Sequence, residues 1–323
     1  MKAIQFEKTG GPEVLQLVDI TLTPPATGEV QMRHTAIGLN FVDTYYRSGL
    51  YPAALPSGLG NEAAGVVTAL GKGVKGFKVG DRVAYGTGSA GAYQEARNIA
   101  ASKLVKLPKG IKDETAAAMM LKGMTVRYLL RATYKLKRGE FAVFHAAAGG
   151  VGSIFGQWAK AIGAKVIGTV GSPEKVAAAK ANGYAYVIDT SKDDLVARVK
   201  EITKGKGVAV VYDAIGKDTL QQSLDCLRPR GLLVSFGNAS GPITNFNMGQ
   251  LAAKGSLYVT RPTLFNYTAT EAEFKATARD LIKMVASGKV KIRINQRYAL
   301  ADAAKAHEDL QGRRTTGASI LVP

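Results

Sequence analysis

The segment at residues 141–163 constrains the fold of this chain more than any other. An apolar run at 141–144 is typical of a buried strand, and it meets a turn of small residues at 146–152. Apolar residues then recur at helical spacing up to residue 162, and a second apolar run follows at 165–170. Strand, turn, helix and strand form one βαβ unit, whose parallel strands need a right-handed crossover. The segment therefore predicts a parallel sheet covered by helices.

The turn in this unit predicts a dinucleotide site. Backbone N–H groups at a helix N-terminus can approach a pyrophosphate closely when the turn is built of glycine. Ala147 stands where the motif G-x-G-x-x-G has its first glycine, which eases the turn. Alanine disturbs this turn only modestly if its φ is negative. The alternative is a purely structural turn, but the complete strand–turn–helix–strand context favours the dinucleotide. The pyrophosphate amides are expected from Gly149, Gly150, Val151 and Gly152.

The end of the second strand favours NADPH over NADH. NAD sites place Asp or Glu near this point to bind the ribose 2′-hydroxyl, whereas this chain has Gly171, Ser172 and, one turn on, Lys175. These residues suit a 2′-phosphate. Glu174 is discordant with that interpretation, although a carboxylate in a first helical turn also complements the helix dipole.

Composition limits which other classes of protein the chain can belong to. The net charge of +18, from 43 basic and 25 acidic residues, is consistent with weak, charge-driven nucleic-acid binding. The basic residues are scattered and not interleaved with aromatics, which argues against a dedicated nucleic-acid module. The single cysteine, Cys226, is expected to be a buried hydrophobe. No apolar run is long enough to span a membrane and no signal peptide is evident, so a cytoplasmic protein is expected.

The pattern along the chain predicts two domains. The first 110 residues consist of short β-branched runs punctuated by glycine, as in a barrel-like β domain. A helix is expected at 115–133, and further strands at 185–188, 208–212, 232–236 and 256–260 complete a six-stranded doubly wound sheet. A helix at 271–287 and a strand at 319–322 then return to the first domain. The predicted boundaries are 1–122 plus 263–323 for the first domain and 123–262 for the inserted one.

Three motifs carry a resemblance to a known family: GNEAAGVV at 60–67, GDRVAY at 80–85 and HAAAGGVG at 145–152. With them the whole chain resembles the medium-chain dehydrogenase/reductases, and more narrowly the bacterial NADPH:quinone oxidoreductases related to zeta-crystallin. The resemblance implies a GroES-like, mostly-β catalytic domain with an inserted Rossmann domain. It also implies NADPH-dependent reduction of quinones in a cleft between the domains.

The residues at the zinc position of this family point away from a metal. Zinc-dependent members carry cysteine near position 40 and Gly-His-Glu near position 60, where this chain has Asn40 and Gly60-Asn61-Glu62. A zinc site needs three or four N, S or O ligands, so no metal is expected. Quinone reduction suits such a site because the phenolate formed is far less basic than the alkoxide from a plain ketone, and so needs no Lewis acid.

The resemblance also implies roles for single residues. Asn40 and Asp43 would orient the ribose or carboxamide of the nicotinamide, and Tyr45 or solvent would supply the proton. The alternatives are that Asp43 caps a short helix and that Tyr45 is a packing residue. Thr190 stands where relatives place a tyrosine against the 2′-phosphate, and Asp189 adds a negative charge beside it. Further candidate cofactor contacts are Thr125, Tyr128, Phe236, Gly237, Asn238, Arg261 and Arg313.

His145 is expected to be structural, because it lies under the phosphate turn and away from the expected nicotinamide end. A homodimer that pairs sheet edges near 255–261 is expected. Two other functions stay open: an NADPH-dependent reductase of alkenal or enone double bonds, and an RNA- or polyanion-binding protein that keeps NADPH as a structural ligand.

Overall fold

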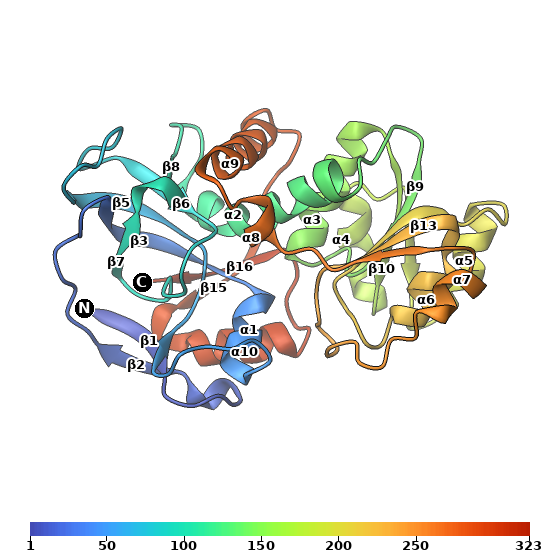
Figure 1. Ribbon diagram of the computed structural model, residues 1–323, viewed down its shortest axis with the longest axis horizontal. Coiled ribbons are helices and arrows are strands. Elements are labelled where there is room, and N and C mark those ends of the chain that lie inside the picture. The colour runs from blue at the N-terminus through green and yellow to red at the C-terminus, as the bar shows by residue number, and fades with distance from the viewer. The chain divides into compact units, whose positions relative to one another are not determined.

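The computed structural model describes residues 1–323, which divide into two compact units (Figure 1). The first unit comprises Met1–Met124, Tyr267–Ser287 and Ile292–Pro323. The second comprises Thr125–Asn266 and Gly288–Lys291. No helix is both long and apolar enough to cross a membrane.

The second unit contains a parallel sheet of six strands in the order β11-β10-β9-β12-β13-β14. This confirms the predicted doubly wound sheet, and the strand order reverses between β9 and β12, the point where open α/β sheets bind ligands. The strands are β9 (Phe141–Phe144), β10 (Lys165–Val170), β11 (Tyr186–Asp189), β12 (Val208–Asp213), β13 (Leu227–Ser235) and β14 (Tyr258–Thr260).

Helices cover both faces of this sheet (Figure 1). On one face the apolar side chains of the strands pack against α5 and α6, with α7 beside them. On the other face an aromatic cluster forms where Phe155 of α3 lies 4.2 Å from Phe144 of β9 and 4.8 Å from Tyr212 of β12, between ring centroids. The helices are α3 (Gly150–Ile162), α4 (Val176–Ala181), α5 (Leu195–Ile202), α6 (Leu220–Asp225) and α7 (Gly249–Ala253). A short helix, α8 (Leu264–Tyr267), follows β14 and includes the last residue of the second unit's main segment, Asn266.

The first unit is mostly β structure around a separate apolar core. A seven-stranded sheet has the order β15-β16-β3-β5-β6-β8, with β7 also paired to β3, and a three-stranded sheet has the order β2-β1-β4. Its strands are β1 (Lys2–Phe6), β2 (Gln16–Asp19), β3 (Glu29–Leu39), β4 (Ser57–Gly58), β5 (Ala63–Leu70), β6 (Arg82–Tyr85), β7 (Ala96–Ala100), β8 (Val105–Lys106), β15 (Ile294–Ala299) and β16 (Ala318–Val322). The main helices are α1 (Phe41–Ser48), α2 (Asp113–Tyr128), α9 (Glu271–Ala286) and α10 (Ala303–Gln311).

Two elements differ from the sequence-based expectation. The helix expected at 115–133 is an α-helix only to Tyr128, and a π-helical turn at Leu129–Thr133 continues it. The expected closing strand is present as β16, but β15 was not predicted, although it pairs in parallel with β16. Its sequence, INQRYA, is largely polar, and the burial along it alternates only between half-buried and exposed residues, so it gives a weak strand signal.

Candidate active site

The turn before α3 presents backbone amides at the carboxyl end of β9. Gly149 is the N-cap of α3, and the first-turn amides of Gly150, Val151 and Gly152 have no acceptor within the helix. A Cβ on Gly152 would lie 2.3 Å from the carbonyl oxygen of Ala146, so only glycine fits there. Ala146 has a positive φ, 57°, whereas the φ of Ala147 is not positive. The condition under which alanine is tolerated at position 147 is therefore met.

The carboxyl end of β10 brings the expected 2′-phosphate residues together. Gly171 has open space around it, and the backbone N–H of Lys175 donates to the carbonyl of Ser172 (3.2 Å). The Ser172 hydroxyl donates to Glu174, and this hydrogen bond lowers the pKa of the exposed Glu174 carboxyl. Glu174 therefore engages the hydroxyl that a phosphate would need.

Thr190 lies at the same corner of the sheet, directly after β11. Its hydroxyl donates to the carbonyl of Val170 (3.1 Å), so it ties the end of β11 to the end of β10. The carboxylate of Asp189 accepts the hydroxyl (2.7 Å) and the backbone N–H (3.1 Å) of Ser191. The negative charge of Asp189 is thus engaged within its own loop, beside the candidate phosphate corner.

The segment after β13 holds the remaining candidates of the second unit. Gly237 packs so closely on Ala214 that a Cβ would lie 2.4 Å from the Ala214 carbonyl oxygen. The Arg261 guanidinium donates to that segment, at the Gly237 carbonyl (2.8 Å) and the Ser235 hydroxyl (3.2 Å). Arg261 therefore fixes the backbone that leads from Phe236 to Asn238. Thr125 and Tyr128 are buried at the end of α2.

His145 belongs to a buried network of four side chains, Thr169, His145, Ser223 and Asp213, named here the His145 network. Its ring nitrogens lie 3.0 Å from the Thr169 hydroxyl and 2.9 Å from the Ser223 hydroxyl. Ser223 donates to Asp213 Oδ2 (2.7 Å), which also accepts the Thr219 hydroxyl, and Asp213 Oδ1 accepts two backbone N–H groups. Burial lowers the pKa of His145, so the ring is neutral. Every polar atom of Asp213 is used within the protein.

In the first unit, Asn40 and Asp43 meet at the start of α1. Asn40 is the N-cap, its backbone N–H donates to Asp43 Oδ2 (2.9 Å), and the Asp43 N–H donates back to the Asn40 carbonyl (3.0 Å). The Tyr93 hydroxyl also donates to Asp43 Oδ2 (2.9 Å). Asp43 Oδ1 is buried and has no partner. Burial raises the pKa of Asp43 to about 7, although the hydrogen bonds from Asn40 and Tyr93 oppose the shift.

Glu62 forms a buried ion pair next to this cap. Its carboxylate accepts hydrogen bonds from the Asn40 side chain (2.8 Å), the Lys122 ammonium (3.0 Å) and the backbone N–H of Leu121 (2.8 Å). Glu62 and Lys122 are both buried. The sequence analysis did not identify Lys122 or Tyr93. A lysine inside the apolar stretch 116–126 was the one available signal for Lys122.

Tyr45 lies on α1 with a buried ring, 7% exposed, that packs against Phe41 and Tyr51 at centroid distances of 5.7 and 5.2 Å. Two more buried atoms of this unit lack a partner: Asn61 Nδ2 and Thr87 Oγ1. Arg313 follows α10 with a φ of 58°. No group of three or more His, Cys, Asp or Glu side chains could hold a metal ion.

Two family descriptions match the chain and define its class. The alcohol dehydrogenase GroES-like domain matches residues 26–109, and the zinc-binding dehydrogenase family matches residues 150–283. The first match lies in the mostly-β unit and most of the second covers the parallel sheet. Together they confirm the predicted fold class, a GroES-like domain combined with a Rossmann domain.

Similar proteins narrow the class. The quinone oxidoreductase of Pseudomonas aeruginosa is 58% identical over 323 residues, covering 100% of this chain and 99% of that protein. The crystal structure of Escherichia coli quinone oxidoreductase complexed with NADPH is 54% identical, with a TM-score of 0.99 and 100% of both chains covered. The 2-haloacrylate reductase of a Burkholderia species is 43% identical, covering 99% of this chain and 98% of that one. The chain therefore belongs to the quinone oxidoreductase group of the medium-chain dehydrogenase/reductase family.

Proposed function

We propose that this protein is an NADPH-dependent quinone reductase. The observation that carries the proposal is the match, over the full length of both chains, to the E. coli quinone oxidoreductase that was crystallised with NADPH. The α3 turn supports it independently, because its free amides and its obligatory Gly152 are what a pyrophosphate requires.

The residues predicted from the sequence would contact NADPH along its length. The Gly149 N–H, predicted as a pyrophosphate contact, instead donates to the Ala146 carbonyl (3.0 Å). We therefore assign the pyrophosphate to the amides of Gly150, Val151 and Gly152, and the 2′-phosphate to Gly171, Ser172 and Lys175, with Thr190 beside them. The segment 236–238, held by Arg261, and the end of α2 at Thr125 and Tyr128 would line the nucleotide, with Arg313 as a further contact. Asn40 and Asp43 would orient the nicotinamide half. Residues 1–122 plus 263–323 then form the catalytic domain and 123–262 the NADPH-binding domain.

When bound, NADPH supplies the reducing equivalents, and the protein positions the acceptor and controls the proton. The amides at the zinc position, Asn40 and Asn61, are poor zinc ligands, and Asn40 instead donates to Glu62. Reducing a quinone produces an oxygen of low basicity, which Tyr45 or solvent can protonate. This chemistry suits a site whose polar groups are amides, carboxylates and hydroxyls.

A second activity is supported by one comparison. The relative named 2-haloacrylate reductase has a name that describes a carbon–carbon double bond conjugated to a carboxylate. A site that delivers a hydride to a conjugated acceptor can serve an enone as well as a quinone, because both delocalise the negative charge. Reduction of enone or alkenal double bonds is therefore the alternative reaction at the same site.

We also propose a homodimer formed through the edge of the parallel sheet. β14 is the terminal strand, and Tyr258 (61% exposed) and Val259 (38%) leave apolar surface along it. An unpaired apolar edge strand is a template for pairing with a second copy. Binding of nucleic acid is expected only as a salt-sensitive effect of the +18 charge.

Steady-state oxidation of NADPH and NADH by chelator-treated protein tests the proposal, with 1,4-benzoquinone as acceptor and the uncatalysed rate subtracted. The expected result is rapid turnover with NADPH and slower turnover with NADH. Lys175→Met should lower the NADPH rate at subsaturating cofactor and leave the NADH rate unchanged. Absence of any enzymatic rate with the quinone, together with turnover of an enone, would replace the first function by the second.

A further inference from the structure

The first turn of α3 and the turn that precedes it need support from outside. Three of the four residues at 149–152 are glycine, the residue that loses the most conformational freedom on folding. A site that binds a pyrophosphate through backbone amides gains affinity when those amides are ordered before the ligand arrives. Side chains that contact this backbone from other elements can therefore affect binding without touching the ligand.

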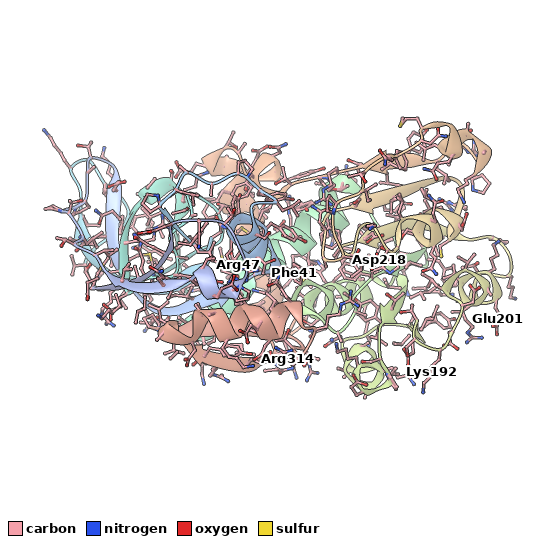
Figure 2. The ribbon with its side chains drawn as sticks, turned by 90° about the horizontal axis from the view of Figure 1, so that it is seen from below. Phe41, Arg47, Lys192, Glu201, Asp218 and Arg314 are labelled. Atoms are coloured by element: carbon pink, nitrogen blue, oxygen red, sulfur yellow. The ribbon has the colours of Figure 1, made fainter.

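Two buried side chains from the segment between α4 and β11 contact this backbone; we name them the Asn182–Tyr184 pair. The Tyr184 hydroxyl donates to the carbonyl oxygen of Gly152 (2.8 Å), in the first turn of α3. Asn182 Nδ2 donates to the carbonyl oxygen of Ala147 (3.4 Å), in the preceding turn. Tyr184 is 6% exposed and Asn182 2% exposed, whereas Lys192, on the loop after β11, lies at the surface (Figure 2).

The ring of Tyr184 lies in a space between α3 and β10 that two glycines leave open. A Cβ on Gly156 of α3 would lie 2.5 Å from Tyr184 Cε2, and a Cβ on Gly168 of β10 would lie 2.6 Å from Tyr184 Cδ1. The backbone beside the ring is also fixed, because the Ala185 N–H donates to the Val166 carbonyl of β10 (3.0 Å). The hydroxyl is therefore held in one place relative to the helix.

The hydrogen bond from Tyr184 fixes Gly152 from the side opposite to a second close contact. A carbonyl oxygen can only accept, so the Tyr184 hydroxyl must donate. Burial raises the pKa of Tyr184, and the hydroxyl keeps its proton throughout the neutral range. A buried hydroxyl without a partner is costly, which favours the observed position of the Gly152 carbonyl. The Cα of the same glycine packs against the Ala146 carbonyl, where no Cβ fits.

We propose that Tyr184 and Asn182 are positioning residues that order the first turn of α3, so that the amides of Gly150, Val151 and Gly152 face the pyrophosphate before NADPH binds. Both side chains act through the backbone and neither touches the ligand. The inference rests on the proposed function, since it needs a dinucleotide as the ligand. It adds a segment some 30 residues beyond the glycine turn to the determinants of cofactor affinity.

The second unit contains a matched control in Tyr212 of β12. Tyr212 is fully buried, and its hydroxyl donates to the Leu129 carbonyl (3.3 Å), away from α3. The rings of Tyr184 and Tyr212 both pack near Phe144, at centroid distances of 6.3 and 6.2 Å. Tyr212→Phe thus removes a buried hydroxyl bound to a backbone carbonyl, as Tyr184→Phe does. A loss of stability common to both variants cannot account for a difference between them.

The first experiment is amide hydrogen exchange on the nucleotide-free protein, followed by mass spectrometry of the peptide that contains the start of α3. Tyr184→Phe should speed exchange in this peptide about fivefold, the scale of one hydrogen bond between neutral groups. Tyr212→Phe should exchange there as the wild type does. This result does not depend on which ligand the protein binds.

The second experiment is calorimetric titration with NADPH and with adenosine 2′-monophosphate, which carries the 2′-phosphate but no pyrophosphate. Tyr184→Phe should weaken NADPH binding by up to about fivefold, because only molecules with an ordered turn bind tightly. Its affinity for adenosine 2′-monophosphate should not change. Tyr212→Phe should match the wild type with both ligands.

Unchanged exchange at α3 in Tyr184→Phe would overturn the inference while leaving the proposed function intact. Equal losses of affinity for the two ligands would also overturn it, because the effect would then not lie at the pyrophosphate. A wild type that does not bind NADPH would overturn the proposed function. If Tyr184→Phe does not fold, Asn182→Ala is the second variant, and it must speed exchange in the same peptide.

Discussion

In the first unit, hydrogen bonds link Arg47 to His307, His307 to Tyr93 and Tyr93 to Asp43; we name these four residues the Asp43 chain. The Asp43 chain and the His145 network contain similar groups, but their hydrogen bonds are completed differently. Each contains a buried aspartate, a buried neutral histidine and a hydroxyl that donates to the carboxylate. In the His145 network both oxygens of Asp213 accept two hydrogen bonds from the protein. In the Asp43 chain one oxygen of the aspartate accepts two and the other accepts none.

This difference leaves the His145 network complete and the Asp43 chain with one unmet hydrogen bond. A fully satisfied network stiffens the fold and has no capacity left for a ligand. Burial with one oxygen unpaired disfavours the charged form of a carboxyl group, in keeping with the raised pKa of Asp43. The comparison also explains why His145, despite its place under the phosphate turn, is a poor candidate for catalysis.

The largest effect is expected for Asp43→Asn. An asparagine can accept from the Asn40 N–H and the Tyr93 hydroxyl with its oxygen, and its NH₂ then occupies the vacant position. Folding should be preserved, but the variant would lose the charge with which Asp43 is proposed to orient the nicotinamide half. We expect kcat/KM for NADPH to fall about 30-fold, from the loss of roughly 2 kcal/mol in one charge-assisted hydrogen bond. Steady-state kinetics measure this, and a rate within twofold of the wild type would contradict it.

Asp213→Asn should affect stability, whereas Asp43→Asn should affect activity. An amide nitrogen cannot accept from the hydroxyls or N–H groups that now donate to Asp213, so one side of the network must break. We expect a loss of about 2 kcal/mol in the free energy of unfolding, the scale of an unsatisfied buried group. Urea denaturation measures it. If instead Asp43→Asn were the less stable of the two variants, the comparison between the two aspartates would fail.

Buried histidines and the buried Asp43 should change the stability of the fold in opposite directions as the pH falls. Burial lowers the pKa of His34 to about 4 and of His307 to about 3. Since unfolded histidine titrates near 6.5, both residues favour unfolding as the pH falls from about 6.5 through these values. Asp43 has a raised pKa, so its contribution is lost as the pH rises through about 7.

Asp43→Asn removes only the second contribution. The variant should therefore gain stability relative to the wild type at pH 8 and gain less at pH 5, measured by thermal unfolding at both values. A stability difference that does not change with pH would show that Asp43 titrates normally.

The smallest effect is expected at the exposed 2′-phosphate corner. Glu174 is fully exposed and accepts from Ser172, and solvent screens its charge, unlike that of Asp43. Glu174→Gln should raise the preference for NADPH over NADH by no more than about twofold, because interactions of exposed charges are weak. The ratio of kcat/KM values for the two cofactors measures the change. An unchanged or lower ratio would show that Glu174 does not oppose the phosphate.

Local patterns predicted the second unit well. β9 and β10 begin and end where their apolar runs do, because a strand between two layers of helices is apolar along its whole length. The structure supports the interpretation of Asp43 as part of a helix cap, because its Oδ2 accepts from the Asn40 N–H. The roles of the predicted site residues remain predictions.

Contacts between residues far apart in the chain could not be predicted from the sequence. Arg47 and His307 are 260 residues apart, and no spacing rule joins them. Tyr93 lies in the loop between β6 and β7 and belongs to no local motif. The sequence of β15 is too polar to predict a strand. The positive φ of Ala146 depends on how the turn fits between β9 and β10, which composition does not reveal.

The most direct test is a crystal structure of the protein with NADPH. The account predicts that the pyrophosphate lies on the backbone amides of Gly150, Val151 and Gly152 and the 2′-phosphate beside Ser172 and Lys175. A complex in which NADPH binds away from this turn would contradict it.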